Sequence, residues 1–284
     1  MKKALLFCAA VAALVLSASC NKTGTDNNTD KKALVLPAAK YTESAKKLVL
    51  TNSSILSIEF TESGRYIIHN QVAKADENVE FIRGTYTVNG SVYTLSDYGT
   101  VTVSGNQVTI ETKEGEKVEA SYTEAPTYPA NDFYTTIARA WKVDKTDISV
   151  SFDGKSSVGV VKNGCDIPAI LKELEQKGNV DLKDEAMAGY VVKEVNFTMA
   201  KTIEIAFTGK PSVAGTISLS ENGEFGYELS GARGVEVFSG KANGTINLNP
   251  GLGANQIMMT LDAEVSSNNK TYNGKVSFIL SPAA

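Results

Sequence analysis

The side chains that could act as nucleophiles or bases are few and stand far apart in the sequence. His69 is the single histidine, so a Ser-His-Asp triad would have to use it, and no Gly-x-Ser-x-Gly turn accompanies it. It ends the apolar run of residues 66–68, and we interpret it as an ordinary strand histidine. Cys165 stands at the start of a predicted helix, where the helix dipole lowers a thiol pKa, but no second cysteine or histidine is near it. We therefore predict no catalytic residue.

The acidic side chains do not form a metal-binding or catalytic pattern either. Asp144, Asp147 and Asp153 are close in sequence, but strand alternation puts the first two on opposite faces, and their order does not match an EF-hand loop. Asp262 and Glu264 share one face of a predicted strand, and we interpret them as solvated residues, not as the carboxylate pair of a glycosidase. We predict no metal site and no cofactor.

Cys20 is the cysteine for which the sequence predicts a definite chemical role. It closes the segment MKKALLFCAAVAALVLSASC, in which two lysines precede an apolar stretch and three small residues. This is the layout of a secretory signal peptide, and the apolar stretch is shorter than the roughly 20 residues that span a bilayer. The small residues before the cysteine resemble a bacterial lipoprotein signal, although Ser17 stands where the usual motif has Leu. Ser17 and Ser19 also suit a plain signal-peptidase site.

The lipoprotein resemblance implies where the protein is and what holds it there. In that family the chain is cut before the cysteine and lipid, such as palmitate, is attached to the thiol. We therefore expect acyl chains on Cys20 to anchor the protein in a cell-envelope membrane, the outer membrane being the expected one. The membrane is then a partner through these chains.

Charge and cysteine content restrict the partners and the source of stability. The 284-residue chain has a formal net charge of −4, and loss of Lys2 and Lys3 with the signal peptide makes the remainder more acidic. We expect no nucleic acid partner, because binding requires basic patches on the protein. With Cys8 removed and Cys20 lipidated, Cys165 has no partner for an intrachain disulfide. Buried apolar cores must therefore supply the stability.

The composition changes along the chain and predicts four segments. The boundary between two β regions rests on residues 123–131, which hold two prolines and no periodicity. The predicted segments are a signal peptide over residues 1–19, the lipidated Cys20 with a flexible tether over 20–39, an N-terminal β domain over 40–125 and a C-terminal β domain over 126–284.

Period-two alternation and tight turns predict an all-β fold. We expect two antiparallel β-meander domains, each a small barrel or sandwich with one or two short helices. Asn89-Gly90 between alternating runs is typical of a hairpin. A short helix is predicted over residues 41–50 with Thr42 as its N-cap. A second helix is expected to be capped by Asp166, with an apolar stripe formed by Ile167, Ile170, Leu171 and Leu174.

The C-terminal domain resembles the lipocalin-like cell-envelope lipoproteins of Bacteroidetes. The resemblance rests on the lipoprotein signal, on the run AWKVD at 140–144, on the run GCD at 164–166 that enters the long helix, and on the meander that follows. Arg139 stands where the Gly-x-Trp motif of lipocalins has its glycine. The resemblance implies a lipocalin-like barrel, supplies no catalytic residue, and favours structural packing for Trp141.

These observations favour a non-catalytic binding module on the membrane. In the first hypothesis the C-terminal barrel holds a small hydrophobic ligand. In the alternative the barrel is filled, and the protein is a structural or protein-interaction subunit of an envelope complex. An envelope hydrolase is the least favoured class. The inward face of the barrel is predicted to carry Ile203, Ile205, Phe225, Tyr227, Ile257, Met259, Val276 and Phe278, or their alternates.

Overall fold

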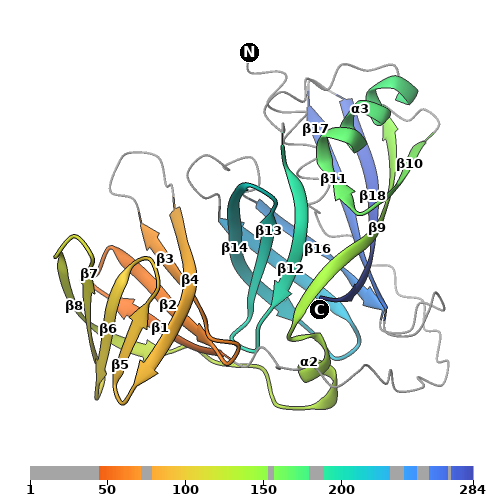
Figure 1. Ribbon diagram of the computed structural model, residues 1–284. Helices are drawn as coiled ribbons and strands as arrows, with labels where there is room; N and C mark the ends of the chain where they lie inside the picture. Colours follow the sequence, from red (N-terminus) through yellow and green to blue (C-terminus); the bar gives the residue numbers. More distant parts are fainter. Residues whose placement is uncertain are drawn as a thin grey trace.

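The chain folds into two antiparallel β-barrels that lie side by side (Figure 1). The computed structural model describes residues 45–71, 79–152, 157–178, 189–230, 240–247, 256–267 and 270–283. The predicted signal peptide and the tether with Cys20 lie outside these ranges. The predicted all-β class with two meanders is confirmed, and both are barrels instead of sandwiches.

The first barrel is an up-and-down meander that closes on itself. Its strands run in sequence order: β1 (Ala45–Thr51), β2 (Ile55–Thr61), β3 (Arg65–Gln71), β4 (Val79–Asn89), β5 (Val92–Leu95), β6 (Gly99–Ser104), β7 (Gln107–Thr112) and β8 (Lys117–Glu124). β1 pairs with both β2 and β8, and this closes the barrel. Because successive strand residues point to opposite faces, Leu48, Ile58 and Ile68 point inward and are fully buried.

The helix predicted over residues 41–50 is wrong where the structure describes that segment. Residues 45–50 belong to β1, in which Leu48 and Leu50 are buried and Val49 is exposed. The segment contains good helix formers, but without it β2 and β8 would each have an unpaired edge. Strand pairing therefore overrides local propensity. The described part of the first barrel contains no helix, so the expectation of short helices holds only for the second.

The second barrel is closed by a pairing between strands distant in sequence. Its elements are α2 (Asp132–Ile137), β9 (Ala140–Phe152), β10 (Val158–Asn163), β11 (Cys165–Asp166), α3 (Ile167–Gly178), β12 (Val191–Phe197), β13 (Thr202–Phe207), β14 (Lys210–Leu219), β15 (Glu224–Ser230), β16 (Gly240–Asn247), β17 (Ile257–Ser267) and β18 (Lys270–Pro282). β9 pairs with β18 along much of its length and with β12 near Trp141. Eight strands form the barrel, and β10 and β11 extend its sheet.

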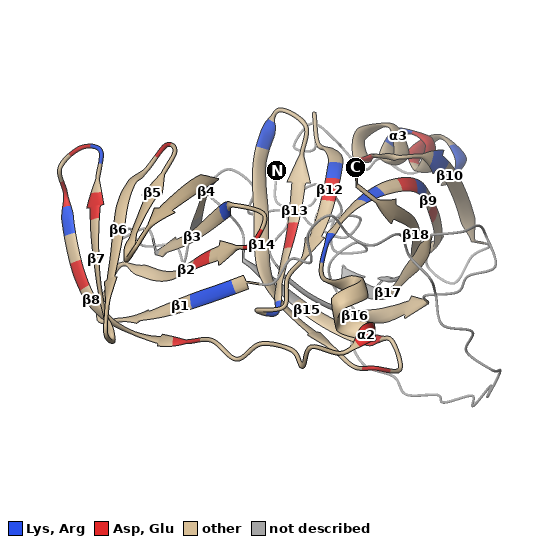
Figure 2. Cartoon of the chain, turned by 60° about the horizontal axis from the view of Figure 1, so that its bottom comes forward, with Lys and Arg blue, Asp and Glu red and all other residues tan. Residues whose placement is uncertain are grey.

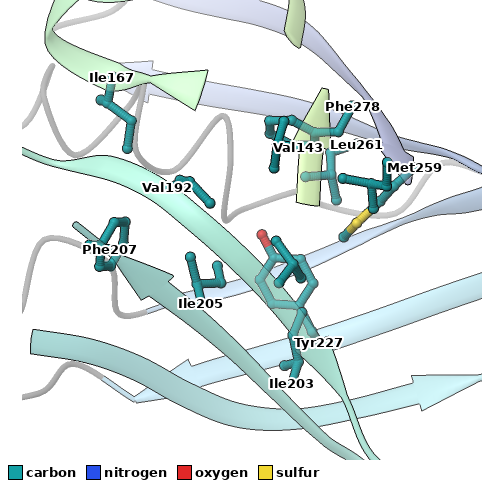
Figure 3. A pocket seen from close by; sticks show the side chains of 12 residues that line it. Val143, Ile167, Val192, Ile203, Ile205, Phe207, Tyr227, Met259, Leu261 and Phe278 are labelled. Atoms are coloured by element: carbon teal, nitrogen blue, oxygen red, sulfur yellow. The ribbon is translucent and has the colours of Figure 1, made fainter. Parts of the chain in front are cut away.

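The interior of the second barrel is filled by its own side chains. All eight residues predicted for the inward face are buried, and Figure 3 shows Ile203, Ile205 and Tyr227 facing a common interior with Met259 and Phe278. The cavity among these side chains measures about 30 Å³, which is room for one or two water molecules. The hydrophobic ligand expected there finds no space in the described interior.

Both described helices follow the first barrel in the sequence, α2 before β9 and α3 after β11. Asp166 accepts a hydrogen bond from the backbone N–H of Ala169 at 3.0 Å, as predicted for the N-cap of α3. The predicted apolar stripe of this helix is buried. None of the described helices combines the length and the apolar character needed to cross a membrane.

The segment between β8 and α2 is bonded to both barrels. The backbone N–H of Ala125 donates to the carbonyl oxygen of Lys47 at 2.8 Å. Tyr128 donates from its backbone N–H to Met199 at 2.8 Å and from its hydroxyl to the carbonyl oxygen of Ile217 at 2.7 Å. The domain limits at residues 125 and 126 stay a prediction about independent folding.

Substitution of Trp141 tests how much this buried side chain stabilises the second barrel. The indole is fully buried and its Nε1 donates to the carbonyl oxygen of Ile137 at 2.9 Å. We predict that Trp141→Ala lowers the free energy of unfolding by about 3–5 kcal/mol. Trp141→Phe keeps most of the packing and should lose only about 0.5–1.5 kcal/mol, since the Ile137 carbonyl loses the indole donor but keeps the backbone N–H of Arg139. Urea denaturation followed by circular dichroism measures both, and equal losses would contradict this account.

Candidate functional site

The two barrels meet through strand faces that point out of each barrel. Since Ile58 and Phe60 fill the first barrel, Ser57 and Glu59 on β2 point outward, yet both are buried. Every residue of β13 is likewise buried. Figure 2 shows a basic segment on β1 and acidic segments on β2 and β13 near this junction. The contact between the barrels is therefore polar and charged.

Glu204 on β13 is fully paired at the junction. Its Oε1 accepts from Nη1 of Arg83 at 2.7 Å, and its Oε2 accepts from Nδ2 of Asn196 at 2.8 Å. Nη1 of Arg65 lies 3.9 Å from the same Oε2. A buried carboxylate is tolerated when it is paired and hydrogen-bonded, and this one links β3 and β4 of the first barrel to β13 of the second.

Glu59 accepts a hydrogen bond through one of its two carboxyl oxygens. Nζ of Lys47 donates to Oγ1 of Thr202 at 3.1 Å, and Oγ1 of Thr202 donates to Oε2 of Glu59 at 2.5 Å. Nζ of Lys47 lies 3.9 Å from that oxygen. The other oxygen, Oε1, is buried and makes no hydrogen bond to any described residue. The side chain of Glu59 is only 2% exposed.

Burial raises the pKa of Glu59 above its ordinary value. The charge of Lys47 and the hydroxyls of Thr202 and Thr198 oppose this change, and the nearby charge of Glu204 adds to it. Desolvation is the largest cause, so the protein environment disfavours the ionised carboxylate.

A cavity of about 230 Å³ opens beside Glu59 at the junction. It has room for several water molecules and is smaller than the pockets of roughly 300–1,000 Å³ that hold drug-sized ligands. Its wall combines polar and apolar side chains from both barrels. The lining residues are Lys47, Ser57, Glu59, Ile67, His69 and Phe81 of the first barrel and Thr202, Ala214, Gly215 and Thr216 of the second.

His69 contributes a second unpaired polar atom to this cavity. Its ring stacks on Phe81 with the centroids 4.8 Å apart, and its buried Nε2 has no hydrogen-bond partner within the described ranges. Burial, with the charge of Lys47, lowers the pKa of His69 to about 4. The imidazole is therefore neutral at pH 7, and its Nε2 donates or accepts according to the tautomer. The strand position of His69 was predicted, but its place in a cavity wall was not.

The other reactive side chains are not brought to the cavity wall. Cys165 is buried in the core of the second barrel, and burial raises the pKa of its thiol to about 12, so the thiol is protonated and poorly nucleophilic at pH 7. Asp153 and the side chains of Asp262 and Glu264 lie outside the described residues. The described His, Cys, Asp and Glu side chains form no group of three that could hold a metal ion.

Comparisons with known proteins give a weak likeness to solved structures, among them two of transferrin binding protein B. No protein-family model matches the chain, and no curated protein matches it. A double mutant of the vaccine antigen transferrin binding protein B from Haemophilus parasuis Hp5 is 11% identical, with 81% of this chain and 54% of that chain covered and a TM-score of 0.25. Intact Ap-TbpB, with N and C lobes, is 12% identical, with 84% and 46% covered and a TM-score of 0.22.

The chain thus spans about half the length of the proteins that it matches. The β-barrel part of the expected family resemblance is present in the structure. Membership of the Bacteroidetes lipocalin-like lipoproteins stays a prediction.

Two conservative substitutions should separate the roles of the buried carboxylates. We predict that Glu204→Gln lowers the free energy of unfolding at pH 7 by about 1–3 kcal/mol, because two arginines lose their partner charge. The partial exposure of Arg83 limits this loss. Glu59→Gln should cost less than Glu204→Gln, since the carboxyl of Glu59 faces only Lys47 at 3.9 Å and burial disfavours its charge. Urea denaturation measures both, and a larger loss in Glu59→Gln than in Glu204→Gln would refute this ranking.

The titration of His69 should report its burial at the junction. As the chain has one histidine, its Cε1–H resonance is unambiguous in a proton NMR titration, and we expect a midpoint near pH 4. Because the folded pKa is lower than the ordinary 6.5, the stability that neutral His69 contributes is present above pH 6.5 and is lost as the pH falls through 4. His69→Gln should remove this part of the acid sensitivity. A midpoint near 6.5 would mean that the ring is solvated.

Proposed function

We propose that the protein is a non-catalytic binding protein of the bacterial cell envelope, with its ligand site in the junction cavity. The observation that carries this proposal is the buried Oε1 of Glu59, which has no hydrogen-bond partner in the described structure and stands in the wall of the cavity. A buried polar atom left without a partner costs about 1–3 kcal/mol. A ligand with a matching polar group would offset that cost, and Nε2 of His69 offers a second contact of the same kind.

The two hypotheses drawn from the sequence are less well supported by the geometry. A hydrophobic ligand inside the second barrel meets a filled interior. An envelope protein would find little apolar surface to bind. The exposed large apolar side chains in the described ranges are Val49, Val88, Val92 and Val161. They are spread over β1, the β4–β5 hairpin and β10, and scattered apolar side chains are usual on soluble surfaces.

Binding is also better supported than catalysis. The thiol of Cys165 is buried away from the cavity with a pKa of about 12. The pKa of about 4 at His69 makes its imidazole a weak base at neutral pH. The polar groups of the cavity wall suit recognition of a small molecule, which is the usual use of a few convergent polar groups in a partly apolar pocket.

Substitution at the rim of the cavity tests the site without touching the buried pairs. Thr216 is exposed and lines the cavity, whereas Thr245 is exposed on β16 of the same barrel and does not line it. We expect native mass spectrometry of the full chain from its own envelope to detect a small polar molecule. That molecule should be lost in Thr216→Trp and kept in Thr245→Trp. A bound molecule that persists in both variants would place the site elsewhere.

Anchoring by Cys20 is the part of the proposal that rests on sequence alone. We predict that Cys20→Ala moves the mature protein from the membrane fraction to the soluble fraction, because acyl chains would be the anchor and the remaining surface is acidic. Cell fractionation followed by a salt wash measures this, and Cys8→Ala is the control that leaves Cys20 in place. Retention of Cys20→Ala on salt-washed membranes would refute a lipid as the sole anchor.

A further inference from the structure

We propose that the junction cavity recognises a neutral, hydroxyl-rich molecule of about the size of one sugar ring. This inference rests on the proposed function and adds the chemical class of the ligand. It follows from three properties of the cavity wall: its charge balance, its hydrogen-bonding groups and its size.

The charges at the cavity offset one another and leave no site for an ion. Nζ of Lys47 lies 3.9 Å from Oε2 of Glu59, so the positive and negative groups of the wall form a pair. The next carboxylate, Glu204, is occupied by Arg83 at 2.7 Å. An anionic ligand would meet Glu59 and a cationic ligand would meet Lys47, each in a site of low solvent access where repulsion is strong. A neutral ligand avoids both.

The unpaired atoms of the wall suit hydroxyl groups. Oε1 of Glu59 accepts a hydrogen bond when the carboxyl is ionised and can donate one when it is protonated, and Nε2 of His69 does either according to its tautomer. A hydroxyl group both donates and accepts, so it matches these atoms in every protonation state. Ser57 and Thr216 add two hydroxyls to the same wall. A ligand with several hydroxyls can therefore pair more than one wall group at once.

The size and the apolar part of the wall fit a compact ring. The volume of about 230 Å³ is below that of pockets for drug-sized ligands. Ile67, Phe81 and Ala214 provide apolar contact, and Gly215, which has no side chain, adds only backbone to the second-barrel side of the wall. A sugar ring presents polar edges and apolar C–H faces, and this combination matches a wall that carries both kinds of surface.

Three probes of equal ring size separate the ligand classes. Glucose is neutral, glucosamine is cationic and glucuronate is anionic at pH 7. In saturation-transfer NMR titrations of the full-length Cys20→Ala protein, prepared without detergent, we expect glucose to bind with a dissociation constant on the order of 1 mM. Glucosamine and glucuronate should bind at least tenfold more weakly. Thr216→Trp should weaken glucose binding at least tenfold, and Thr245→Trp should leave it unchanged.

A substitution in the wall gives the second readout. His69→Phe should weaken glucose binding at least tenfold, because it removes Nε2 while its aromatic ring can still stack on Phe81. This variant decides the question if Thr216→Trp does not fold, as judged by circular dichroism.

The outcomes distinguish failure of the ligand class from failure of the site. Preferred binding of glucosamine or glucuronate, lost in Thr216→Trp, would overturn the neutral class and leave the proposed site standing. Glucose binding that persists in both Thr216→Trp and His69→Phe would overturn the cavity as the sugar site. Absence of binding by all three probes, together with no copurifying molecule, would mean that water alone fills the cavity and would overturn both proposals.

Discussion

Because both sheets close into barrels, the two barrels can contact each other only through side chains that point outward. Alternation directs the apolar side chains of β2 and β13 to the two interiors, so the outward positions of these strands hold Glu59 and Glu204. Joining the barrels therefore buries two carboxyl groups, and buried carboxylates are tolerated only with partners. Arg83 beside Glu204 and the Lys47–Thr202 pair beside Glu59 meet this requirement.

Glu204 is hydrogen-bonded at both carboxyl oxygens, and Glu59 is hydrogen-bonded to described residues at only one. Both oxygens of Glu204 accept hydrogen bonds, whereas Oε1 of Glu59 accepts none from the described residues. Well-packed apolar side chains often replace a buried ion pair without loss of stability, so adhesion of the barrels alone does not require an open oxygen. Local departures of this kind, where a native structure leaves a polar group unpaired, are typical of functional sites. The cavity beside Glu59 is therefore the candidate site, and the paired Glu204 is not part of it.

The strands could be predicted from the sequence because alternation and turn residues act locally. The Asn89-Gly90 hairpin forms with Gly90 at φ +60°, and the inward face of the second barrel is the predicted one. Local information failed at residues 45–50, where closure of the barrel imposes a strand on a helix-forming composition. It also failed at the junction. Alternation identifies which residues share a face but not what covers that face, and Lys47 contacts Thr202 across 155 positions of sequence.

The chain enters and leaves the first barrel at the same end, because β1 and β8 are antiparallel neighbours with Leu48 opposite Glu124. The backbone bond from Ala125 to Lys47 and the side-chain bond from Lys47 to Thr202 then join the start of β1 directly to the linker and to the second barrel. Tension applied to the chain ahead of Ala45 would thus pass to the second barrel through a few bonds around Lys47. Most of the first barrel lies off that mechanical path, so a pull from the N-terminal side would strain the junction before it strained either core.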